Sequence, residues 1–420
     1  MRRVLLAGLV SVLAMLPGPV PSAAAPAAIW ADPCQMLGTA KVVSCFSDPL
    51  TGPDVSSRIV QSLGALVASA RPGDTIKIMM YHWRDGVWPE RLAAEVVAAY
   101  RAGVHVEVML DEQSRGFRPI ATLRAAGVPL LVCDDEEGAA DGQDDCVMVE
   151  DGPYGDNEHL PMNHGKLFLF ELGGVPVVAA GSSNLTAWDY ETAWNDFVRI
   201  RGDRALHTFF TEFFDRAWAD DWMGWDTNAE RDRAGDPVSG GDLPERGWVY
   251  PRLEPGDPIA GQLANTTACH ADGDGDGDWD KRVWVAISIW NENTRTGILD
   301  ELDRLDAAGC SVRVLIADGV SRPWLQTLRQ RLSGDPAASD KVRVVCHLHH
   351  KFIVIDARYD GAYREVVLTG SHIYATGSLR NSVELNVRVG GNDNVDNGVV
   401  VDYINRFQRL YDYAPTDACD

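Results

Sequence analysis

One short pattern occurs twice in this sequence, and its repetition constrains the fold more than any other feature. The segments 164–171 and 349–356 read HGKLFLFE and HHKFIVID: a histidine, a lysine two places on, an apolar run and a final acidic residue. Because side chains alternate along a strand, the histidine and the lysine of each copy point to the same side. A single copy is also explained by a chance surface pair beside a core strand, but a second copy argues against chance. The candidate catalytic residues are His164, Lys166, His349 and Lys351.

The two copies lie within a longer internal repeat. Each is followed by an apolar strand and a Gly-Ser pair, GSSN at 181–184 and GSHI at 370–373. Each is preceded by a strand, a helix that ends at Ala-Gly, and another strand. These elements are predicted at 74–81, 89–101 and 104–110, and again at 281–290, 298–306 and 310–316. Apolar strands that alternate with helices predict an α/β fold with helices on both faces of each sheet.

The repeat also divides the chain. The first lobe is predicted at 26–225 and the second at 266–420, with a polar linker or surface excursion at 226–265 rich in Gly, Pro and charge. Lobes related by duplication are expected to face each other, with their His-x-Lys strands at a pseudo-two-fold axis. Other predicted elements are helices at 54–70, 203–222 and 399–413 and a strand at 130–133.

The duplicated HxKxxxxD pattern with a trailing GSxN resembles the phospholipase D superfamily, and the resemblance covers almost the whole chain after residue 25. The run GSSNLT…TAWNDFVRI also looks like secreted actinobacterial members of that family. The resemblance implies two phospholipase D-like lobes. Each would be a mixed sheet flanked by helices, with the active site at the lobe interface.

The paired motifs predict a two-step reaction on a phosphodiester. One neutral histidine attacks phosphorus in line and forms a phosphohistidine, while the other donates a proton to the leaving oxygen. The second histidine then takes a proton from the attacking water or alcohol. Lys166 and Lys351 are expected to hold the non-bridging oxygens, so that catalysis requires no metal. The resemblance implies that His164 is the nucleophile and His349 the acid/base; the symmetry of the motifs leaves the sequence itself silent on that order.

Supporting residues are implied by the same resemblance. Each histidine needs an acceptor that fixes its tautomer, and in the family an acidic residue downstream of GSxN supplies it. The candidates are Asp196, with or without Asn195, in the first lobe, and Glu384 in the second. Phosphate donors or supports are also expected within the two Gly-Ser motifs, namely Ser182, Asn184 and Ser371.

Two positions depart from the family pattern. Glu171 replaces the motif aspartate, whose counterpart is Asp356; this acidic place is usually structural in the family. Ile373 replaces the asparagine expected after Gly370-Ser371, so the second lobe loses a phosphate donor. His372 either compensates for that loss or has a core or rim role.

The N-terminus predicts export. Arg2 and Arg3 precede an apolar run from Val4 to Leu16 and a small-residue cleavage region near residue 25. The apolar run is too short to span a bilayer. We therefore expect residues 1–25 to be a signal peptide and the mature protein to be secreted and soluble.

Eight cysteines, all beyond the signal segment, agree with an oxidising compartment. Short spacing favours the pairs Cys34–Cys45 and Cys133–Cys146. A bridge between two strands of the second lobe, Cys310–Cys346, leaves Cys269–Cys419. Zinc and thioredoxin-like sites are not expected, because the sequence has no C-x-x-C pair.

The formal charge of −23 bears on the partners. A long polyanion such as DNA binds through lysine and arginine, and an acidic surface repels it on average. Nucleic acid is therefore an unexpected partner, although a local basic cleft would reverse this expectation. A phospholipid substrate, transient contact with a membrane or vesicle surface and a monomeric chain are expected.

An acidic stretch resembles the first half of a calcium-binding EF-hand loop. Its oxygen ligands alternate and glycine stands at the sixth place, as that loop requires. Val283, however, occupies the place of the bidentate glutamate, so a solvated acidic turn is the alternative. The candidate calcium ligands are Asp272, Asp274, Asp276, Asp278 and Asp280.

Two further features remain open. The first lobe carries an acidic insert at 134–163, which is either a surface loop or a loop that rims the active site. Aromatic residues at equivalent strand ends, Tyr81, Trp83 and Trp290, either form core and cleft wall or contact an acyl chain or glycerol. The remaining tryptophans singled out are expected to pack: Trp188, Trp194, Trp218, Trp222 and Trp225.

The sequence thus predicts a secreted phosphodiesterase of the phospholipase D type. Its expected substrate is a phospholipid such as phosphatidylcholine, which would give phosphatidic acid and choline, and an alcohol in place of water would give transphosphatidylation. A secreted nuclease of the same superfamily is the first alternative. A phosphate- or lipid-binding protein that has lost turnover is the second.

Overall fold

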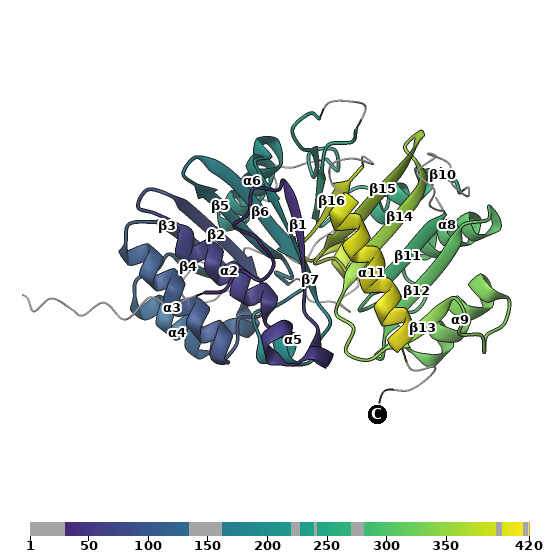
Figure 1. Ribbon diagram of the computed structural model, residues 1–420, viewed down its shortest axis with the longest axis horizontal. Helices are drawn as coiled ribbons and strands as arrows, with labels where there is room; N and C mark the ends of the chain where they lie inside the picture. Colours follow the sequence, from purple (N-terminus) through teal and green to yellow (C-terminus); the bar gives the residue numbers. More distant parts are fainter. Residues whose placement is uncertain are drawn as a thin grey trace, which may run out of the picture.

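The computed structural model describes residues 30–133, 162–219, 227–238, 242–269, 281–391, 397–414 and 419. These residues form two lobes that lie side by side, each built on one mixed β-sheet (Figure 1). The sheets share a run of six strands in the same order, as the internal repeat requires. The predicted α/β fold of two duplicated lobes is therefore confirmed.

The first sheet contains the strands β1 (Val42–Phe46), β2 (Thr75–Met80), β3 (His105–Asp111), β4 (Leu130–Cys133), β5 (Lys166–Leu172), β6 (Val175–Gly181) and β7 (Asp196–Arg201). Their order is β1-β7-β6-β5-β2-β3-β4. β2, β3 and β4 run parallel, whereas β5 is antiparallel to both of its neighbours. This arrangement places the start of β5 beside the end of β2, at one edge of the sheet.

The second sheet contains β8 (Asp232–Ala234), β9 (Arg246–Tyr250), β11 (Arg282–Ile287), β12 (Ser311–Ala317), β13 (Val342–Val345), β14 (Lys351–Tyr359), β15 (Ala362–Gly370) and β16 (Glu384–Gly390), and β10 (Thr266–Ala268) pairs with β14 off the main path. Their order is β13-β12-β11-β14-β15-β16-β9-β8. β14 is thus the counterpart of β5, and β11 that of β2.

The helices are α1 (Pro53–Ser56), α2 (Arg58–Ser69), α3 (Val87–Arg101), α4 (Arg118–Ala125), α5 (Ala187–Glu191), α6 (Arg204–Trp218), α7 (Pro258–Ala264), α8 (Thr296–Ala307), α9 (Arg322–Ser333), α10 (Thr376–Arg380) and α11 (Asn397–Tyr413), with short 3₁₀ turns at Pro49–Thr51 and Glu112–Ser114. The predicted helix at 54–70 is divided into α1 and α2 at Ser57. Most other predicted elements lie within a few residues of their observed bounds.

Three apolar cores hold these layers together. One packs α2, α3 and α4 on the first sheet, and a second packs α7, α8 and α9 on the other sheet. The third joins the two lobes and includes the apolar faces of α6 and α11; α11 runs between the sheets in Figure 1. Since this shared core contains residues of both lobes, burial of apolar surface fixes how the lobes dock.

The segment 226–265, predicted as a linker or surface excursion, contributes a strand to the second sheet. β9 is hydrogen-bonded to β16 and is therefore a strand of the second sheet. Gly247 of β9 also packs under α6 of the first lobe, where an added Cβ would come within 2.9 Å of Leu206 and Phe210. The polar composition of this segment gave no sign of a strand, because β16, to which β9 is hydrogen-bonded, lies far along the chain.

Disulfides tie the chain at three places within the described residues. The predicted pair Cys34–Cys45 is confirmed. The predicted pairs Cys310–Cys346 and Cys269–Cys419 are wrong, because the bridges are Cys269–Cys310 and Cys346–Cys419. The Cys133–Cys146 prediction falls partly on residue 146, which lies outside the described residues.

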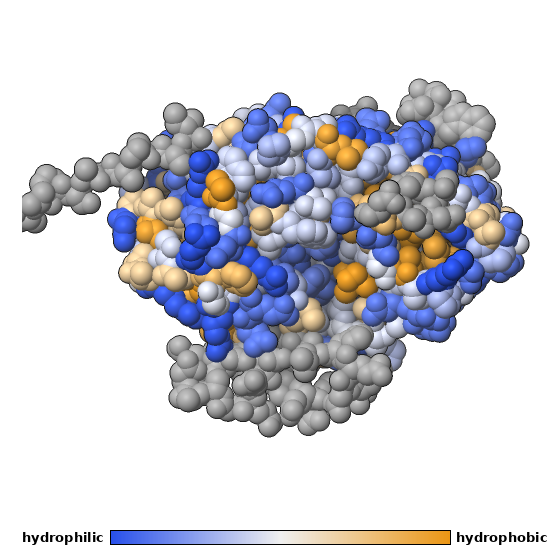
Figure 2. Space-filling model, turned by 90° about the horizontal axis from the view of Figure 1, so that it is seen from below, coloured by the Kyte–Doolittle hydropathy of each residue, from blue (hydrophilic) through white to orange (hydrophobic). Residues whose placement is uncertain are grey.

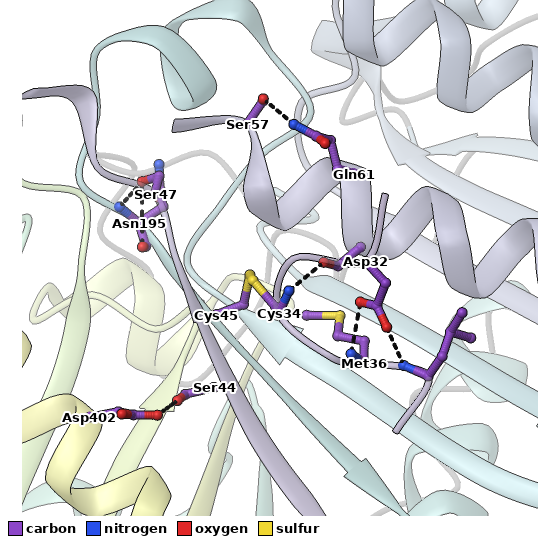
Figure 3. The surroundings of a disulfide bond; sticks show 12 residues. Asp32, Cys34, Met36, Ser44, Cys45, Ser47, Ser57, Gln61, Asn195 and Asp402 are labelled. Carbon is purple, nitrogen blue, oxygen red and sulfur yellow. Dashed lines mark hydrogen bonds between the residues drawn. A yellow bond between two sulfur atoms is a disulfide. The ribbon is translucent and has the colours of Figure 1, made fainter. Parts of the chain in front are cut away.

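The N-terminal strand β1 joins both lobes (Figure 3). The Cys34–Cys45 bridge anchors it to the preceding loop, and it pairs with β7 of the first sheet. Ser44 donates a hydrogen bond to Asp402 of α11 (2.7 Å). Ser47 accepts one from the backbone N–H of Asn195 (2.6 Å). The strand thus reaches from α11 to the segment that carries the first-lobe supporting residues.

Across the described residues, no helix combines the length and apolar character that a membrane crossing needs. The predicted signal peptide at 1–25, the predicted calcium ligands at 272–280 and nearly all of the acidic insert lie outside the described residues, as do Trp222 and Trp225.

Candidate active site

The two His-x-Lys pairs lie where the lobes meet. Lys166 and Lys351 are the first residues of β5 and β14, and each histidine stands two places earlier. The backbone N–H of His164 donates to the carbonyl of Val383 in the second lobe (2.9 Å), and that of His349 to Trp194 in the first (3.0 Å). Each motif is therefore hydrogen-bonded to the opposite lobe. These bonds bring the four predicted side chains together at the lobe interface.

Each histidine takes its hydrogen-bond partner from the opposite lobe. His164 Nδ1 lies 2.9 Å from Oε1 of Glu384, and His349 Nδ1 lies 2.7 Å from Oδ1 of Asn195. An acceptor at Nδ1 places the ring proton there and leaves Nε2 for the substrate. Glu384 and Asn195 stand at equivalent places in the two repeats, so the support is symmetric in position. Its charge differs, because one partner is a carboxylate and the other a neutral amide.

Burial keeps both histidines neutral in the empty site. Desolvation lowers the pKa of His164 to about 4, although Glu384 opposes the shift. The pKa of His349 lies well below its usual range, because of burial first and the charges of Lys351 and Lys166 second. A neutral His164 is the form that a nucleophile needs. His349 is likewise neutral, and the two ammonium charges nearby oppose its protonation.

Each lysine is held beside the histidine of its own motif. Each donates a hydrogen bond to the carbonyl of its own motif histidine, Lys166 at 2.8 Å and Lys351 at 2.9 Å. Burial lowers the pKa of Lys166 to about 7, with the charge of Lys351 as the next cause, and burial lowers the pKa of Lys351 to about 8. Two buried cations so close together create a site that favours an anion.

The Gly-Ser motifs support the histidine partners. Ser182 donates to Oδ1 of Asn195 (3.0 Å), and Ser371 donates to Oε2 of Glu384. The backbone N–H of the residue after each partner donates back to the serine hydroxyl. Both predicted serines therefore hold the residue that orients a histidine.

Asp196 has a different role from the one expected. Its carboxylate lies 2.8 Å from Nδ1 of His350 and accepts hydrogen bonds from Tyr403 (2.7 Å) and Thr369. These donors lower its pKa below the usual range in spite of burial. The partner of His349 is Asn195, and Asp196 instead locks the first lobe to three residues of the second.

A buried carboxylate that the sequence analysis missed lies behind Asn195. The side-chain amide of Asn195 donates to the carbonyl of Asp189 (3.1 Å), which fixes the amide with its oxygen toward His349. Asp189 Oδ1 also lies 3.4 Å from His349 Nδ1 and accepts from the backbone N–H of Asn184 (3.1 Å). Comparison of the repeats would have found no signal here, because the equivalent residue is Ser378.

The two departures from the motif have separate explanations. Glu171 forms an ion pair with Arg204 (2.8 Å), and Asp356 pairs with Arg282. Both acidic residues lie five places beyond their motif lysines along the strands, away from the histidines, which is consistent with structural roles. His372 does not replace the missing asparagine as a phosphate donor, because Ser378 and Arg295 occupy its two ring nitrogens.

Aromatic side chains wall the site on the first-lobe side. The ring of Tyr81 lies edge-on to His164 with centroids 4.7 Å apart, and Nζ of Lys166 lies 5.1 Å from its centre. The expectation that Trp188 packs is wrong: it is 44% exposed and lies edge-on to His349 at 5.5 Å. Trp83 and Trp290 are buried core residues.

Within the ranges that the structure describes, no cluster of three or more His, Cys, Asp or Glu could hold a metal ion. The site contains two imidazoles, which can act as acid and base, and two ammonium groups, which can stabilise negative charge.

The comparisons with known proteins agree with this geometry. The sequence matches the family described as "Cardiolipin synthase, PLD-like domain" over residues 63–218 and 280–411. No curated protein matches it. Among solved structures, phosphatidylserine synthase of Haemophilus influenzae has a TM-score of 0.56 at 10% identity, covering 86% of this chain and 87% of that one. Polyphosphate kinase of Porphyromonas gingivalis has a TM-score of 0.50 at 13% identity, covering 88% of this chain and 50% of that one.

These structural similarities show a shared fold. The chain spans half the length of the polyphosphate kinase that it resembles. The family match covers more than half of the chain and includes both His-x-Lys motifs. The protein therefore belongs to the phospholipase D-like family, whose members carry out phosphoryl transfer without a metal cofactor.

Proposed function

We propose that this protein is a secreted phospholipase D that hydrolyses phospholipids such as phosphatidylcholine to phosphatidic acid and a free headgroup. The observation that carries the proposal is the convergence of His164, Lys166, His349 and Lys351 at the lobe interface. In the first step, Nε2 of His164 forms a bond to phosphorus and the bond to the headgroup oxygen breaks. His349 donates its Nε2 proton to that oxygen as it leaves.

In the second step, the neutral His349 takes a proton from water, whose oxygen attacks phosphorus. The phosphorus–nitrogen bond breaks and His164 is restored. An alcohol in place of water gives transphosphatidylation by the same route. Lys166 and Lys351 offset the negative charge that collects on the non-bridging oxygens in both steps.

The unequal partners of the histidines support this assignment of roles. Glu384 places a carboxylate on His164 Nδ1, which makes Nε2 more basic and more nucleophilic. Asn195 places a neutral oxygen on His349 Nδ1, so the protonated ring is a stronger acid. The nucleophile thus has a carboxylate as its hydrogen-bond partner, whereas the proton donor has an amide, with the Asp189 carboxylate farther away at 3.4 Å from its Nδ1.

A phospholipid is preferred over nucleic acid as the substrate because of charge. The net charge of −23 opposes approach of a long polyanion. The face of the molecule in Figure 2 is mostly hydrophilic with separate hydrophobic areas, which suits contact with a lipid surface. Three disulfides among the described residues are compatible with secretion.

The first experiment incubates the purified protein with phosphatidylcholine vesicles and, separately, with plasmid DNA, both with a chelator present. His164→Asn and His349→Asn variants run alongside, with His105→Asn, an exposed residue at the start of β3, as the matched control. Choline release that both site variants abolish and the control retains supports the proposal. DNA cleavage without choline release would make the protein a nuclease, and no reaction on either would favour a binding protein.

A second experiment separates the two roles. With a p-nitrophenyl phosphodiester the leaving group needs no proton, so His349→Asn should still release one equivalent of nitrophenol in a burst and accumulate a covalent adduct on His164. Mass spectrometry of the denatured protein locates the adduct. An adduct on His349 in the His164→Asn variant would reverse the assignment.

A further inference from the structure

The supporting residues of His164 extend beyond Glu384 into a buried chain of hydrogen bonds. Ser378 donates from Oγ to Oε1 of Glu384, the same oxygen that lies 2.9 Å from His164 Nδ1. Ser378 Oγ also lies 3.0 Å from Nδ1 of His372. The Nε2 atom of His372 contacts Nη1 of Arg295. Each of these side chains is at most a few per cent exposed, so water does not supply the alternative partners.

The donors and acceptors along this chain have one consistent direction. Arginine only donates, so His372 Nε2 accepts and its proton sits on Nδ1. His372 therefore donates to Ser378, whose hydroxyl proton is directed to Glu384. The carboxylate can only accept, so the remaining proton must be on His164 Nδ1. The chain thus specifies a single tautomer for each of its two imidazoles.

Arg295 is itself firmly held. Its guanidinium forms two hydrogen bonds with Asp257, from Nε (2.7 Å) and Nη2 (2.5 Å), and a third with the carbonyl of Ile373 (2.9 Å). Its backbone lies in the left-handed region with φ of 51°, which is costly for a residue other than glycine. Strain retained at a buried arginine indicates that the surroundings fix its position.

The ring of His372 is fixed as well. Tyr250 of β9 stacks on it with centroids 3.7 Å apart and planes 10° apart. Tyr250 also pairs in register with Glu384 across β9 and β16. The groups that face His372 are Tyr250, Arg295, Ser378 and, at longer range, Arg252 and His164.

The first lobe has no equivalent chain. At the place of Ser378 it has the carboxylate Asp189, and at the place of Glu384 the amide Asn195. The two supports therefore differ in order. His164 contacts the Glu384 carboxylate, which accepts from the Ser378 hydroxyl. His349 contacts the Asn195 amide, which donates to the Asp189 carboxylate (3.3 Å). The imidazole and guanidinium of the longer chain belong to the second lobe alone.

We propose that His372 and Arg295 are positioning residues for His164, holding it through Ser378 and Glu384 in the tautomer whose Nε2 lone pair faces the substrate. Neither residue touches the reacting atoms. The role as stated rests on the proposed function, because His164 is taken as the nucleophile there.

The first test needs no substrate. Long-range ¹⁵N–¹H spectra of the wild-type protein labelled on histidine should show His372 and His164 protonated at Nδ1, with His164→Asn and His372→Asn used to assign the signals. His372→Ala should shift and broaden the His164 signals, because Ser378 then no longer fixes the position of the Glu384 carboxylate that holds His164 Nδ1. A wild-type His372 protonated at Nε2, or a His164 signal unchanged in a folded His372→Ala protein, would overturn the proposal.

The second test measures turnover on a phosphodiester. His372→Ala and Arg295→Met should each lower kcat about tenfold or more with KM within about twofold, as loss of an orienting neighbour does elsewhere. His372→Asn should keep most of the activity, because its amide can accept from Arg295 and donate to Ser378. Arg304→Met, on helix α8, which begins directly after Arg295, and bonded to backbone carbonyls, is the control and should leave kcat unchanged.

The outcomes separate the two proposals. An inactive wild-type protein whose spectra show the expected tautomers would refute the proposed function and leave the positioning chain supported. Equal losses of kcat in Arg304→Met and Arg295→Met, matched by equal losses of thermal stability, would reduce the chain to a purely structural role. If His372→Ala does not fold, the wild-type spectra and His372→Asn still decide.

Discussion

At the scale of single residues, the two buried lysines have the largest electrostatic consequences. Each is almost wholly removed from water, yet a phosphate ligand needs both ammonium groups charged. Burial lowers the pKa of Lys166 to about 7 and that of Lys351 to about 8. An anionic substrate between them stabilises the charged forms, so substrate binding and protonation are linked.

This linkage predicts a pH profile. In the free protein both lysines are charged below about pH 7 and lose their protons as the pH rises from about 7 to 8. kcat/KM, which reports the free protein, should therefore fall over that range. kcat, which reports the complex, should remain level to higher pH. Steady-state kinetics between pH 5 and 9.5 check this expectation, and a fall of both parameters at the same pH would contradict it.

The same burial predicts that Lys166 destabilises the fold. Its pKa is lower in the folded than in the unfolded state, so the unfolded chain binds more protons between about pH 7 and 10 and stability should rise with pH there. Lys166→Met should abolish activity, by more than about 100-fold, and raise the unfolding free energy by about 1–2 kcal/mol. Thermal unfolding at pH 6 and 9 measures this, and the gain should be larger at pH 6.

A matched variant shows whether burial is the cause. Lys341 pairs with Asp306 at the surface, with its side chain 30% exposed. Lys341→Met should change stability by less than about 0.5 kcal/mol. A lower melting temperature for Lys166→Met than for the wild type would show that the hydrogen bond to the His164 carbonyl outweighs the cost of the buried charge.

Sequence reasoning identified the four central side chains because spacing and repetition report them directly, whereas Glu384 was implied by the family resemblance. It misassigned Asp196, since neighbouring residues of a strand face opposite ways and only the register decides which one meets a histidine. Alignment of the two repeats makes Asn195 the equivalent of Glu384, and would have identified Asn195 as the partner of His349. Asp189 and Arg295 left no such signal, because their roles depend on packing between segments far apart.

At the scale of elements, glycines let strands approach the site closely. Gly181 ends β6 beside β7, and a Cβ there would lie 2.2 Å from the backbone oxygen of Asp196 and 2.7 Å from Cα of Phe197. Gly370 ends β15 in the same way beside β16. The serine after each glycine supports a histidine partner, so this close approach sets the position of the site.

Gly181→Ala is therefore expected to destabilise the protein strongly, by about 2–4 kcal/mol or more. The added Cβ would clash with backbone atoms, which cannot move aside by changing rotamer as a side chain can. Gly261 within α7 is the control, since a Cβ there meets nothing within 4 Å. Gly261→Ala should stabilise by about 0.5–1 kcal/mol through helix propensity. Chemical denaturation of both variants checks the pair; a Gly181→Ala protein as stable as the wild type would contradict the clash.

Most elements were predictable because periodicity and end signals are local. β9 was not, since its partner β16 follows more than a hundred residues later and its polar flanks are typical of a linker. The disulfides show the same limit. Cys34–Cys45 closes a short loop and was found, whereas Cys346–Cys419 joins residues separated by 73 places.

At the scale of the whole molecule, negative charge surrounds a site that attracts an anion. The surface carries a formal charge of −23 in the full sequence, while the cleft holds two buried lysines. Long-range repulsion acts on large anionic assemblies, and the short-range field of the lysines acts on a single phosphodiester. The molecule should therefore discriminate between substrates by the charge of the surface that presents them.

This predicts an effect of salt that depends on the lipid. On vesicles rich in anionic lipid, raising the ionic strength from about 0.02 to 0.2 M shortens the screening length and should increase the rate several-fold. On zwitterionic phosphatidylcholine the rate should change by less than about twofold. Headgroup release from both vesicle types at matched lipid concentration measures the contrast, and a salt-induced decrease on anionic vesicles would instead indicate a basic docking surface.

The two-lobed architecture followed from the duplicated His-x-Lys motif. If two copies of the motif form a single active site, the two lobes that carry them must meet. The manner of docking did not follow. The lobes are held together by contacts between distant segments. These are the packing of the apolar face of α11, the hydrogen bond from β1 to α11, and the contact of Asp196 with His350. Each lobe's sequence, taken alone, is equally compatible with an independent domain.

The crosswise support of the two histidines has a last consequence. Glu384 of one lobe orients His164 of the other, and Asn195 does the reverse for His349. A lobe that has come away from its neighbour loses its own histidine geometry and also removes that of its partner. The turnover rate of a preparation therefore reports the fraction of molecules whose two lobes are docked. An inhibitor that only separates the lobes would abolish activity as fully as one that occupies the active site.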